Sequence, residues 1–127
     1  MKSKQTIETN TAPEAIGPYS QGIILGNLIF TSGQIALNRE GQIIGTEIAE
    51  QTEQVIKNLS EVLKAGGSKL SYILKTTVFL KNMNDFAAMN EVYKKYITEK
   101  PARSTVEVSA LPKEALVEID CIATIEK

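Results

Sequence analysis

An arginine in the stretch PARSTVEV, residues 101–108, is the first candidate for chemistry in this chain. Val106 and Val108 alternate with polar neighbours, which predicts a β-strand that begins close to Arg103. The planar guanidinium of arginine suits a carboxylate, because the two groups can join through parallel charge-assisted hydrogen bonds. Thr105 would point to the same face as Arg103, since side chains alternate along a strand. A solvated charge at a strand edge is the alternative interpretation, and this stretch alone does not decide between them.

Two further polar side chains come from other expected elements. Glu118 lies in a strand expected over about 115–125, on the face opposite Val117 and Ile119. It could act as a general base or hold a water molecule, which typically contributes about 10²–10⁴-fold to a rate, or it could be a solvent-facing carboxylate. Asn90 borders the apolar stripe of an expected helix, so it is either a structural amide or one that faces a ligand.

Two turn motifs add candidates from the first third of the chain. GPYSQG, residues 17–22, presents Tyr19 directly after a proline-fixed turn. FTSGQ, residues 30–34, closes a strand with Ser32 and Gly33, and glycine would let a backbone N–H approach an anion. Both motifs are also typical of ordinary loop packing. Together these residues indicate a possible carboxylate-binding site, although none of them is specific singly.

The absence of one residue type restricts the chemistry more than any motif does. The chain has no histidine and one cysteine. This removes Ser-His-Asp and Cys-His nucleophilic schemes and the HExxH zinc site. A tetrahedral zinc site within one chain is also disfavoured. We therefore expect any chemistry to be carried by Arg, Glu or Asp, Tyr, hydroxyls, amides and water.

Composition also bears on location and partners. Cys121 is the only cysteine, so no internal disulfide can form, which suits a reducing compartment. The chain has no apolar leader and nothing near the roughly 18 apolar residues of a membrane span. The net charge of −1 comes without a basic stripe and offers no long-range attraction for nucleic acid or anionic membranes. These features predict a cytoplasmic protein.

Hydrophobic periodicity predicts one α+β domain over residues 1–127. A first helix is expected from about Glu47 to Ala65, ended by Gly66-Gly67, and a second from Asn84 or Asp85, either of which can cap it, to a point before Pro101. The apolar stripe of the second helix would comprise Phe86, Met89, Val92, Tyr93, Tyr96 and Ile97. The expected strands include a hairpin over 23–31, a largely buried strand over 72–81, and final strands over 104–109 and about 115–125.

The element order β-β-β-α-β-α-β-β favours a mixed sheet with two helices packed on one face. Apolar residues are also scattered over the other face, which suggests that another subunit covers it.

Several motifs together carry a resemblance to a known family. From about Ala12 to the C-terminus the chain resembles the Rid family, the RidA/YjgF-type reactive intermediate deaminases. The motifs that carry the resemblance are, in order, GPYSQG, FTSGQIAL, FLKNMNDFAAMNEVY, KPARSTVEV and LPKEALVEID. The resemblance implies a chorismate-mutase-like sandwich with a mixed six-stranded sheet. It also implies a homotrimer with a central β-barrel and pockets at the subunit interfaces.

The activity implied by the resemblance is hydrolysis of 2-imino and enamine acids to 2-keto acids and ammonia, without a cofactor. The substrates would be 2-aminoacrylate/2-iminopropanoate and 2-iminobutanoate, released by pyridoxal-phosphate dehydratases. Arg103 would bind the substrate carboxylate and Glu118 would hold and activate the attacking water. The remaining pocket residues implied in this way are Tyr19, Ser32, Gly33 and Asn90.

Thr105 is a departure, because many relatives carry cysteine at this position. The implied role there is a backbone N–H contact to the carboxylate, which threonine preserves. Two other functions remain open at this point. The same pocket could sense 2-keto acids without turnover in a regulatory trimer or serve a protein partner. A ribonuclease or translation inhibitor is disfavoured by the lack of histidine and the near-neutral charge. The sequence leaves the main physiological imine undecided.

Overall fold

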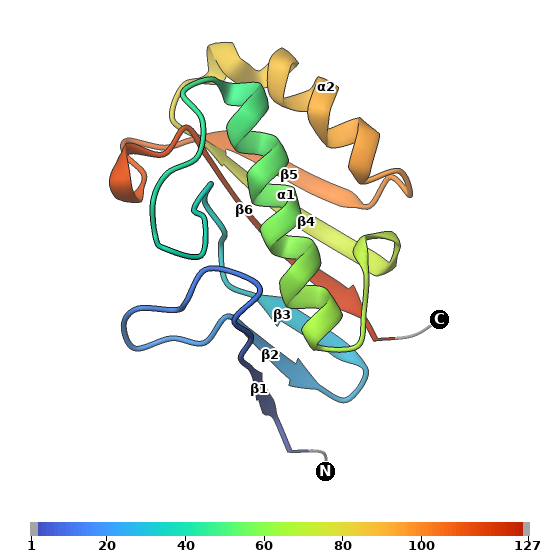
Figure 1. The fold of residues 1–127 in the computed structure, drawn as a ribbon. Coiled ribbons are helices and arrows are strands. Elements are labelled where there is room, and N and C mark those ends of the chain that lie inside the picture. Colours follow the sequence, from blue (N-terminus) through green and yellow to red (C-terminus); the bar gives the residue numbers. More distant parts are fainter. Residues whose placement is uncertain (1–2, 126–127) are drawn as a thin grey trace.

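Six strands form one mixed sheet in the computed structural model, which describes residues 3–125 (Figure 1). The strands are β1 (Gln5–Ile7), β2 (Gly22–Leu25), β3 (Leu28–Thr31), β4 (Ile73–Leu80), β5 (Ala102–Glu107) and β6 (Val117–Thr124). Their order across the sheet is β1-β2-β3-β6-β4-β5. Neighbouring strands are antiparallel except β4 and β5, which run parallel because α2 connects them as a crossover.

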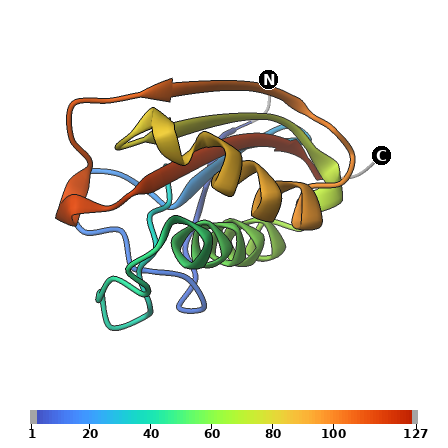
Figure 2. The same cartoon turned by 90° about the horizontal axis from the view of Figure 1, so that it is seen from above.

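Two helices, α1 (Ile48–Ala65) and α2 (Phe86–Tyr96), pack on the same face of the sheet (Figure 2). At the start of α1 the side chain of Glu50 accepts a hydrogen bond from the backbone N–H of Glu47. The helix ends at Ala65, with Gly66 as its C-cap. Gly67 follows with a φ of 88°, in the left-handed region, so that the Ser68 N–H reaches the Leu63 carbonyl at 2.8 Å. The sequence therefore stops α1 where the chain must turn back towards the sheet.

The core lies between the sheet and the helices. Its fully buried side chains include Ile29, Val55, Ile56, Leu59, Val62, Leu63, Val78, Leu80, Val117 and Ile119. Each such side chain contributes roughly 1.5–3 kcal/mol when it is buried on folding. Among residues 3–125 no helix has the length and apolar character needed to cross a membrane.

Residues 3–125 also contain three short 3₁₀ turns: η1 (Leu70–Tyr72), η2 (Met83–Asp85) and η3 (Pro112–Glu114). The turn η2 corrects the predicted cap of the second helix. Asp85 occupies the cap position of α2 without a side-chain hydrogen bond, and Asn82 instead accepts from the Asn84 N–H at 2.9 Å. The side-chain cap thus serves the 3₁₀ turn rather than the helix.

The α+β architecture and the element order are confirmed, and the boundaries differ at two strands. β5 spans Ala102–Glu107 rather than 104–109, because its register with β4 runs from Lys75↔Ala102 to Leu80↔Glu107. The first strand, Gln5–Ile7, has three residues, too few to show a clear alternation, and the sequence pattern gave it no range. Arg103 therefore lies inside the paired part of β5.

The face of the sheet away from the helices carries apolar side chains from five strands. Cross-strand partners share a face, and the pairs Ile23↔Phe30, Phe30↔Ile122 and Phe79↔Glu118 place these residues opposite the helices. Phe30 and Val106 remain 40% and 43% exposed. We call this surface the open face, defined by Ile23, Phe30, Phe79, Val106 and Ile122. An apolar surface of this kind on a folded chain commonly marks a contact with another protein.

Candidate functional site

Arg103 points from β5 towards α2, where neutral side chains surround its guanidinium. Its Nη1 donates to Asn90 Oδ1 at 2.8 Å. The guanidinium carbon lies 4.8 Å from the centre of the Tyr93 ring and 5.5 Å from that of Phe86. No carboxylate of residues 3–125 forms an ion pair with Arg103. The positive charge is therefore held in place without being neutralised.

Thr105 shares this face of β5, as predicted, because it lies two residues beyond Arg103. Its Oγ1 is buried and has no hydrogen-bond partner within the described part of the chain. Arg103, Thr105 and Asn90 thus form one group of predicted site residues between β5 and α2.

Glu118 lies on β6 with its carboxylate directly over Gly33. A Cβ on Gly33 would meet Glu118 Oε2 at 2.0 Å, so the carboxylate occupies space that any other residue at position 33 would fill. Burial raises the pKa of Glu118, and the nearby charge of Asp120 raises it further. A half-buried carboxylate with a raised pKa is suited to general acid–base chemistry.

The loop before β2 supplies Tyr19, whose side chain is 55% exposed. Gln21 fixes this loop, because its side chain accepts from the Thr9 N–H at 2.7 Å and donates to the carbonyls of Thr9 and Pro13. Ser32 adds a second link by donating to the Ser20 carbonyl at 2.5 Å. The hydrogen bonds of the Gln21 amide and the Ser32 hydroxyl therefore fix the conformation of the loop that carries Tyr19.

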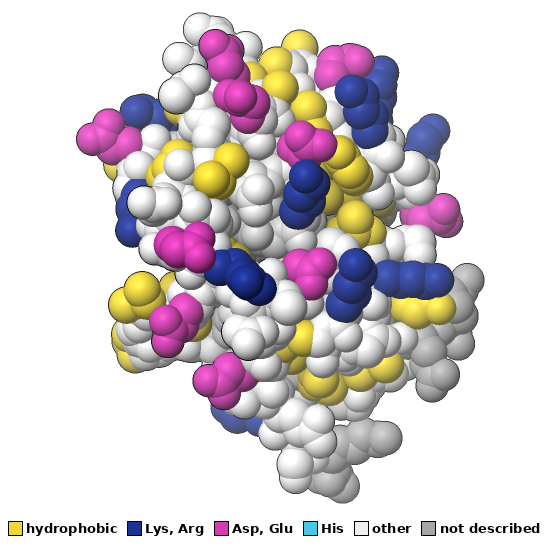
Figure 3. Space-filling model, viewed as in Figure 1, with side chains coloured by type: hydrophobic (Ala, Val, Ile, Leu, Met, Phe, Trp, Pro, Cys, Tyr) yellow, Lys and Arg dark blue, Asp and Glu magenta, His cyan; other side chains and the backbone are white. Residues whose placement is uncertain are grey.

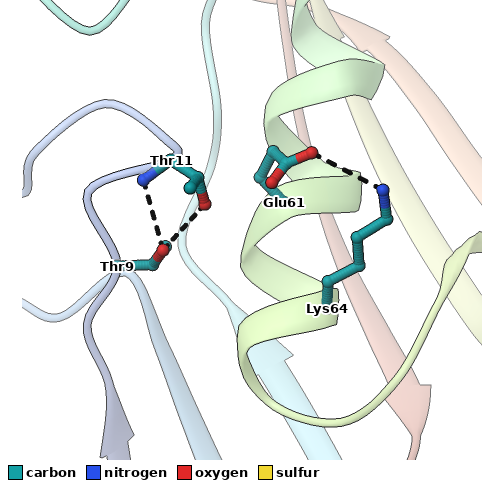
Figure 4. A network of polar contacts seen from close by, with 4 residues as sticks. All are labelled: Thr9, Thr11, Glu61 and Lys64. Atoms are coloured by element: carbon teal, nitrogen blue, oxygen red, sulfur yellow. Dashed lines mark hydrogen bonds and ion pairs between the residues drawn. The ribbon is translucent and has the colours of Figure 1, made fainter.

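Two polar contacts near this loop are exposed at the surface rather than buried. Figure 4 shows the turn in which Thr11 N–H donates to Thr9 Oγ1 at 3.2 Å, together with the Glu61–Lys64 pair on α1. That pair spans 3.6 Å and is largely exposed, so it contributes only about 0–1 kcal/mol. Neither contact bears on the candidate site directly.

A cavity of about 800 Å³ joins four predicted site residues: Tyr19, Ser32, Gly33 and Glu118. Its lining also includes apolar residues: Pro13, Ile16, Ile35, Leu37 and Pro112. Lys113, which lines it as well, donates from Nζ to the Gly41 carbonyl at 3.0 Å and so links two loops of the wall. The cavity places the Glu118 carboxylate among apolar residues and further charged side chains, those of Glu14, Arg39, Glu40 and Lys113, and this mixture of apolar walls with a few polar groups suits a small-molecule site.

Arg103 and Glu118 lie on opposite faces of the sheet. In the register Arg103 is opposite Thr76 on β4, and Thr76 is opposite Cys121 on β6, so these three side chains share the helix-covered face. Glu118 is three residues from Cys121 and points the other way. Within one chain the structure brings the predicted residues together in two groups, and it does not join the groups.

Cys121 packs in the core, as its position on the apolar side of β6 predicts. Burial raises the pKa of its thiol to about 12, which leaves it unreactive near neutral pH. Among residues 3–125 no group of three or more His, Cys, Asp or Glu residues is placed to hold a metal ion.

Sequence reasoning assigned Phe86 and Tyr93 to the apolar stripe of the second helix and gave them no other role. In the structure both contact Arg103, and Asn90 lies between them on the same helix face. The spacing 86, 90, 93 is the signal that could have found this arrangement, because residues three and four apart lie on one side of a helix.

Comparisons with known proteins agree over nearly the whole chain. Residues 9–125 match the profile of the family described as Endoribonuclease L-PSP. A RutC family protein of Pyrococcus abyssi is 51% identical over 123 residues, which cover 95% of this chain and 97% of that protein. The 2-iminobutanoate/2-iminopropanoate deaminase of Escherichia coli K12 is 47% identical over 123 residues, or 94% and 96% of the two chains.

The fold also has close counterparts among solved structures. The crystal structure of E. coli TdcF with bound serine matches with a TM-score of 0.90 at 42% identity, covering 94% of this chain and 98% of that one. The sandwich expected from the sequence motifs is therefore confirmed.

Proposed function

The chain belongs to the RidA/YjgF family, and from this membership we propose that it hydrolyses reactive 2-imino and enamine acids to 2-keto acids and ammonia. The substrate class is that named for the E. coli deaminase, 2-iminobutanoate and 2-iminopropanoate. TdcF binds serine, which like these imines presents a carboxylate beside a nitrogen-bearing carbon. The observation that carries the proposal is the Glu118 carboxylate seated over Gly33 in a cavity with both apolar and charged walls.

The reaction needs little beyond orientation and one base. In the proposed mechanism Arg103 binds the substrate carboxylate through its guanidinium fork. Glu118 accepts a proton from a water molecule as the water oxygen attacks the imine carbon. The same carboxyl then returns a proton to nitrogen and becomes a carboxylate again. The carbon–nitrogen bond breaks and ammonia leaves, while the carbinolamine hydroxyl passes its proton to the Glu118 carboxylate and becomes the keto oxygen. A protonated imine is already a strong electrophile, so correct positioning can supply much of the rate.

The two groups of site residues suggest that each active site is built from two chains. Arg103 and Glu118 face opposite sides of their own sheet, so one chain alone does not place both beside one substrate. The apolar open face offers a surface through which copies of the chain can associate. We propose a homotrimer in which Arg103 of one subunit and Glu118 of its neighbour complete each pocket.

The direct test couples purified threonine dehydratase to this protein and follows release of 2-ketobutyrate, with semicarbazide trapping residual imine. We expect wild type to accelerate release and Arg103→Ala to leave it at the uncatalysed rate. If folded wild type gives no acceleration, the deaminase proposal is refuted, and binding of 2-ketobutyrate without turnover would then indicate a regulatory keto-acid binder.

Subunit complementation tests the composite site separately. Arg103→Ala and Glu118→Gln chains are unfolded together in urea, refolded as a mixture, and checked for mixed trimers by native mass spectrometry. Each mixed trimer would contain one intact pocket, so a random one-to-one mixture should recover about a quarter of wild-type activity. Mixed trimers without recovered activity would rule out a pocket shared between chains.

The family description names a ribonuclease, and we expect no RNA binding of that kind. The net charge is −1, and on the helix-covered face acidic and basic side chains are interspersed (Figure 3). Binding to a single-stranded RNA oligonucleotide at low salt, weakening steeply as salt increases, would contradict this expectation.

A further inference from the structure

The Arg103 side chain is supported by three residues of one helix face and by the sheet beneath it. Phe86, Asn90 and Tyr93 lie at successive positions of that face of α2, and each contacts the guanidinium. All three are uncharged. A guanidinium has five N–H donors, and one of them is taken by Asn90. The contacts therefore fix the group and leave most of its donors and its full charge available.

Tyr93 differs from the other two because it is anchored at its far end. Its side chain is 7% exposed, and its hydroxyl lies 2.7 Å from Thr76 Oγ1, a residue with no exposed surface. Thr76 is the β4 partner of Arg103 in the strand register. The Tyr93 ring is thus fixed between the sheet and the helix, with the guanidinium near it.

We propose that Tyr93 is a positioning residue for Arg103, which holds the guanidinium through its ring while the Thr76 hydrogen bond fixes the ring. The inference rests on the proposed function, since its purpose is to present Arg103 to a substrate carboxylate. An acidic partner would hold an arginine equally firmly but would neutralise it. The absence of an ion pair at Arg103 within residues 3–125 is what a carboxylate-binding role requires.

The first test is the affinity for 2-ketobutyrate, measured by calorimetry together with kcat and KM. Tyr93→Leu should weaken binding about tenfold through loss of the ring contact. Tyr93→Phe keeps the ring but loses the Thr76 hydrogen bond, so its affinity should lie between those of wild type and Tyr93→Leu. Met89→Ala is the matched control, because Met89 is fully buried on the same helix and is not one of the three residues that hold the Arg103 guanidinium, so its loss should lower stability and leave the affinity unchanged.

Asn90→Asp tests whether the neutrality of the surroundings matters. The change keeps the shape of the side chain but gives Arg103 a carboxylate partner, so the fold should be as stable as wild type or more so. Binding of 2-ketobutyrate should nevertheless weaken about tenfold or more, because the fork is already occupied. A purely structural role for Asn90 predicts the opposite combination, reduced stability with unchanged affinity per folded molecule.

A second measurement needs no substrate and separates this inference from the proposed function. Nuclear magnetic resonance relaxation of the Arg103 side chain should show a rigid guanidinium in wild type and a mobile one in Tyr93→Leu. If Arg103 is equally ordered in both, Tyr93 does not position it and the inference is overturned. If the order is lost but wild type neither binds 2-ketobutyrate nor turns over the imine, the positioning role stands and the deaminase proposal fails.

Discussion

Gly33→Ala is the substitution that tests most directly where Glu118 must lie. The new Cβ would stand 2.0 Å from Glu118 Oε2, 2.7 Å from Cδ and 2.9 Å from Cγ. Ordinary contact begins at 3.4 Å, so the carboxylate oxygen must retreat by about 1.4 Å. A misplacement of about 1 Å in a catalytic group can cost on the order of 10²-fold in rate. We therefore expect kcat/KM to fall about 100-fold.

The same substitution should have a small effect on stability. The φ of Gly33 lies outside the left-handed region, so alanine fits the backbone, and the obstacle is a side chain that can rotate. An off-rotamer Glu118 would cost about 0.5–1.5 kcal/mol, measurable as a lower free energy of unfolding in urea. That cost should vanish in a Glu118→Ala background, because the obstructing atoms are gone.

Gly66→Ala is the matched control for Gly33→Ala. Its Cβ would lie 2.7 Å from methyl groups of Ile7 and Ile29, so it should destabilise the core by about 1–3 kcal/mol while kcat/KM stays near wild type. Near-normal turnover in Gly33→Ala would refute the argument, since it would show that Glu118 need not occupy this place. A stability loss that persists without the Glu118 side chain would locate the clash elsewhere.

Three further substitutions address the base, the clamp and the core. Because the pKa of Glu118 is raised, kcat/KM should be lost as pH falls through a pKa higher than the ordinary value for glutamate. Asp120→Asn should move this acidic limb of the pH profile to lower pH, since it removes a charge that raises the pKa. An acidic limb that does not move would exclude the Asp120 charge as a contributor. Arg103→Lys should abolish imine turnover almost as fully as Arg103→Ala, because a point charge cannot reproduce the guanidinium fork, and near-normal turnover would count against the clamp. Thr52→Val should raise the free energy of unfolding in urea by about 1 kcal/mol, because Thr52 Oγ1 is buried without a hydrogen-bond partner among residues 3–125; a lower free energy of unfolding would mean that the hydroxyl has one.

The fold could be predicted from the sequence because each main element has a strong local signal. The spacing of apolar residues identified α1, the β-branched and aromatic composition identified β4, and alternation identified β6. The bounds of β5 were not predicted correctly and those of β1 were not predicted at all, because pairing with a neighbouring strand determines both. The start of β5 is set by its register with β4, and Gln5–Ile7 becomes a strand by pairing with β2.

The site was predictable to a smaller extent for the same reason. Motifs named Arg103 and Glu118, but no local pattern shows that β4 places them on opposite faces of one sheet. The contact between Glu118 and Gly33 joins residues 85 positions apart, so it also depends on the tertiary arrangement. Tyr93 was hidden for a different reason, since a buried aromatic residue in a helix stripe is usually explained by packing alone.

The charges of Arg103 and Glu118 give a physical reason for the proposed association of subunits. Among residues 3–125, neither Arg103 nor Glu118 forms an ion pair, although both are partly buried. A desolvated charge without a partner opposes folding, and the raised pKa of Glu118 records this cost on the acidic side. If a neighbouring subunit brings the two charges to one pocket, each reduces the cost of the other, and a substrate carrying a carboxylate and a protonated imine complements both. The proposed trimer would then unite opposite charges that a single chain keeps apart, so binding of substrate and association of subunits should strengthen each other.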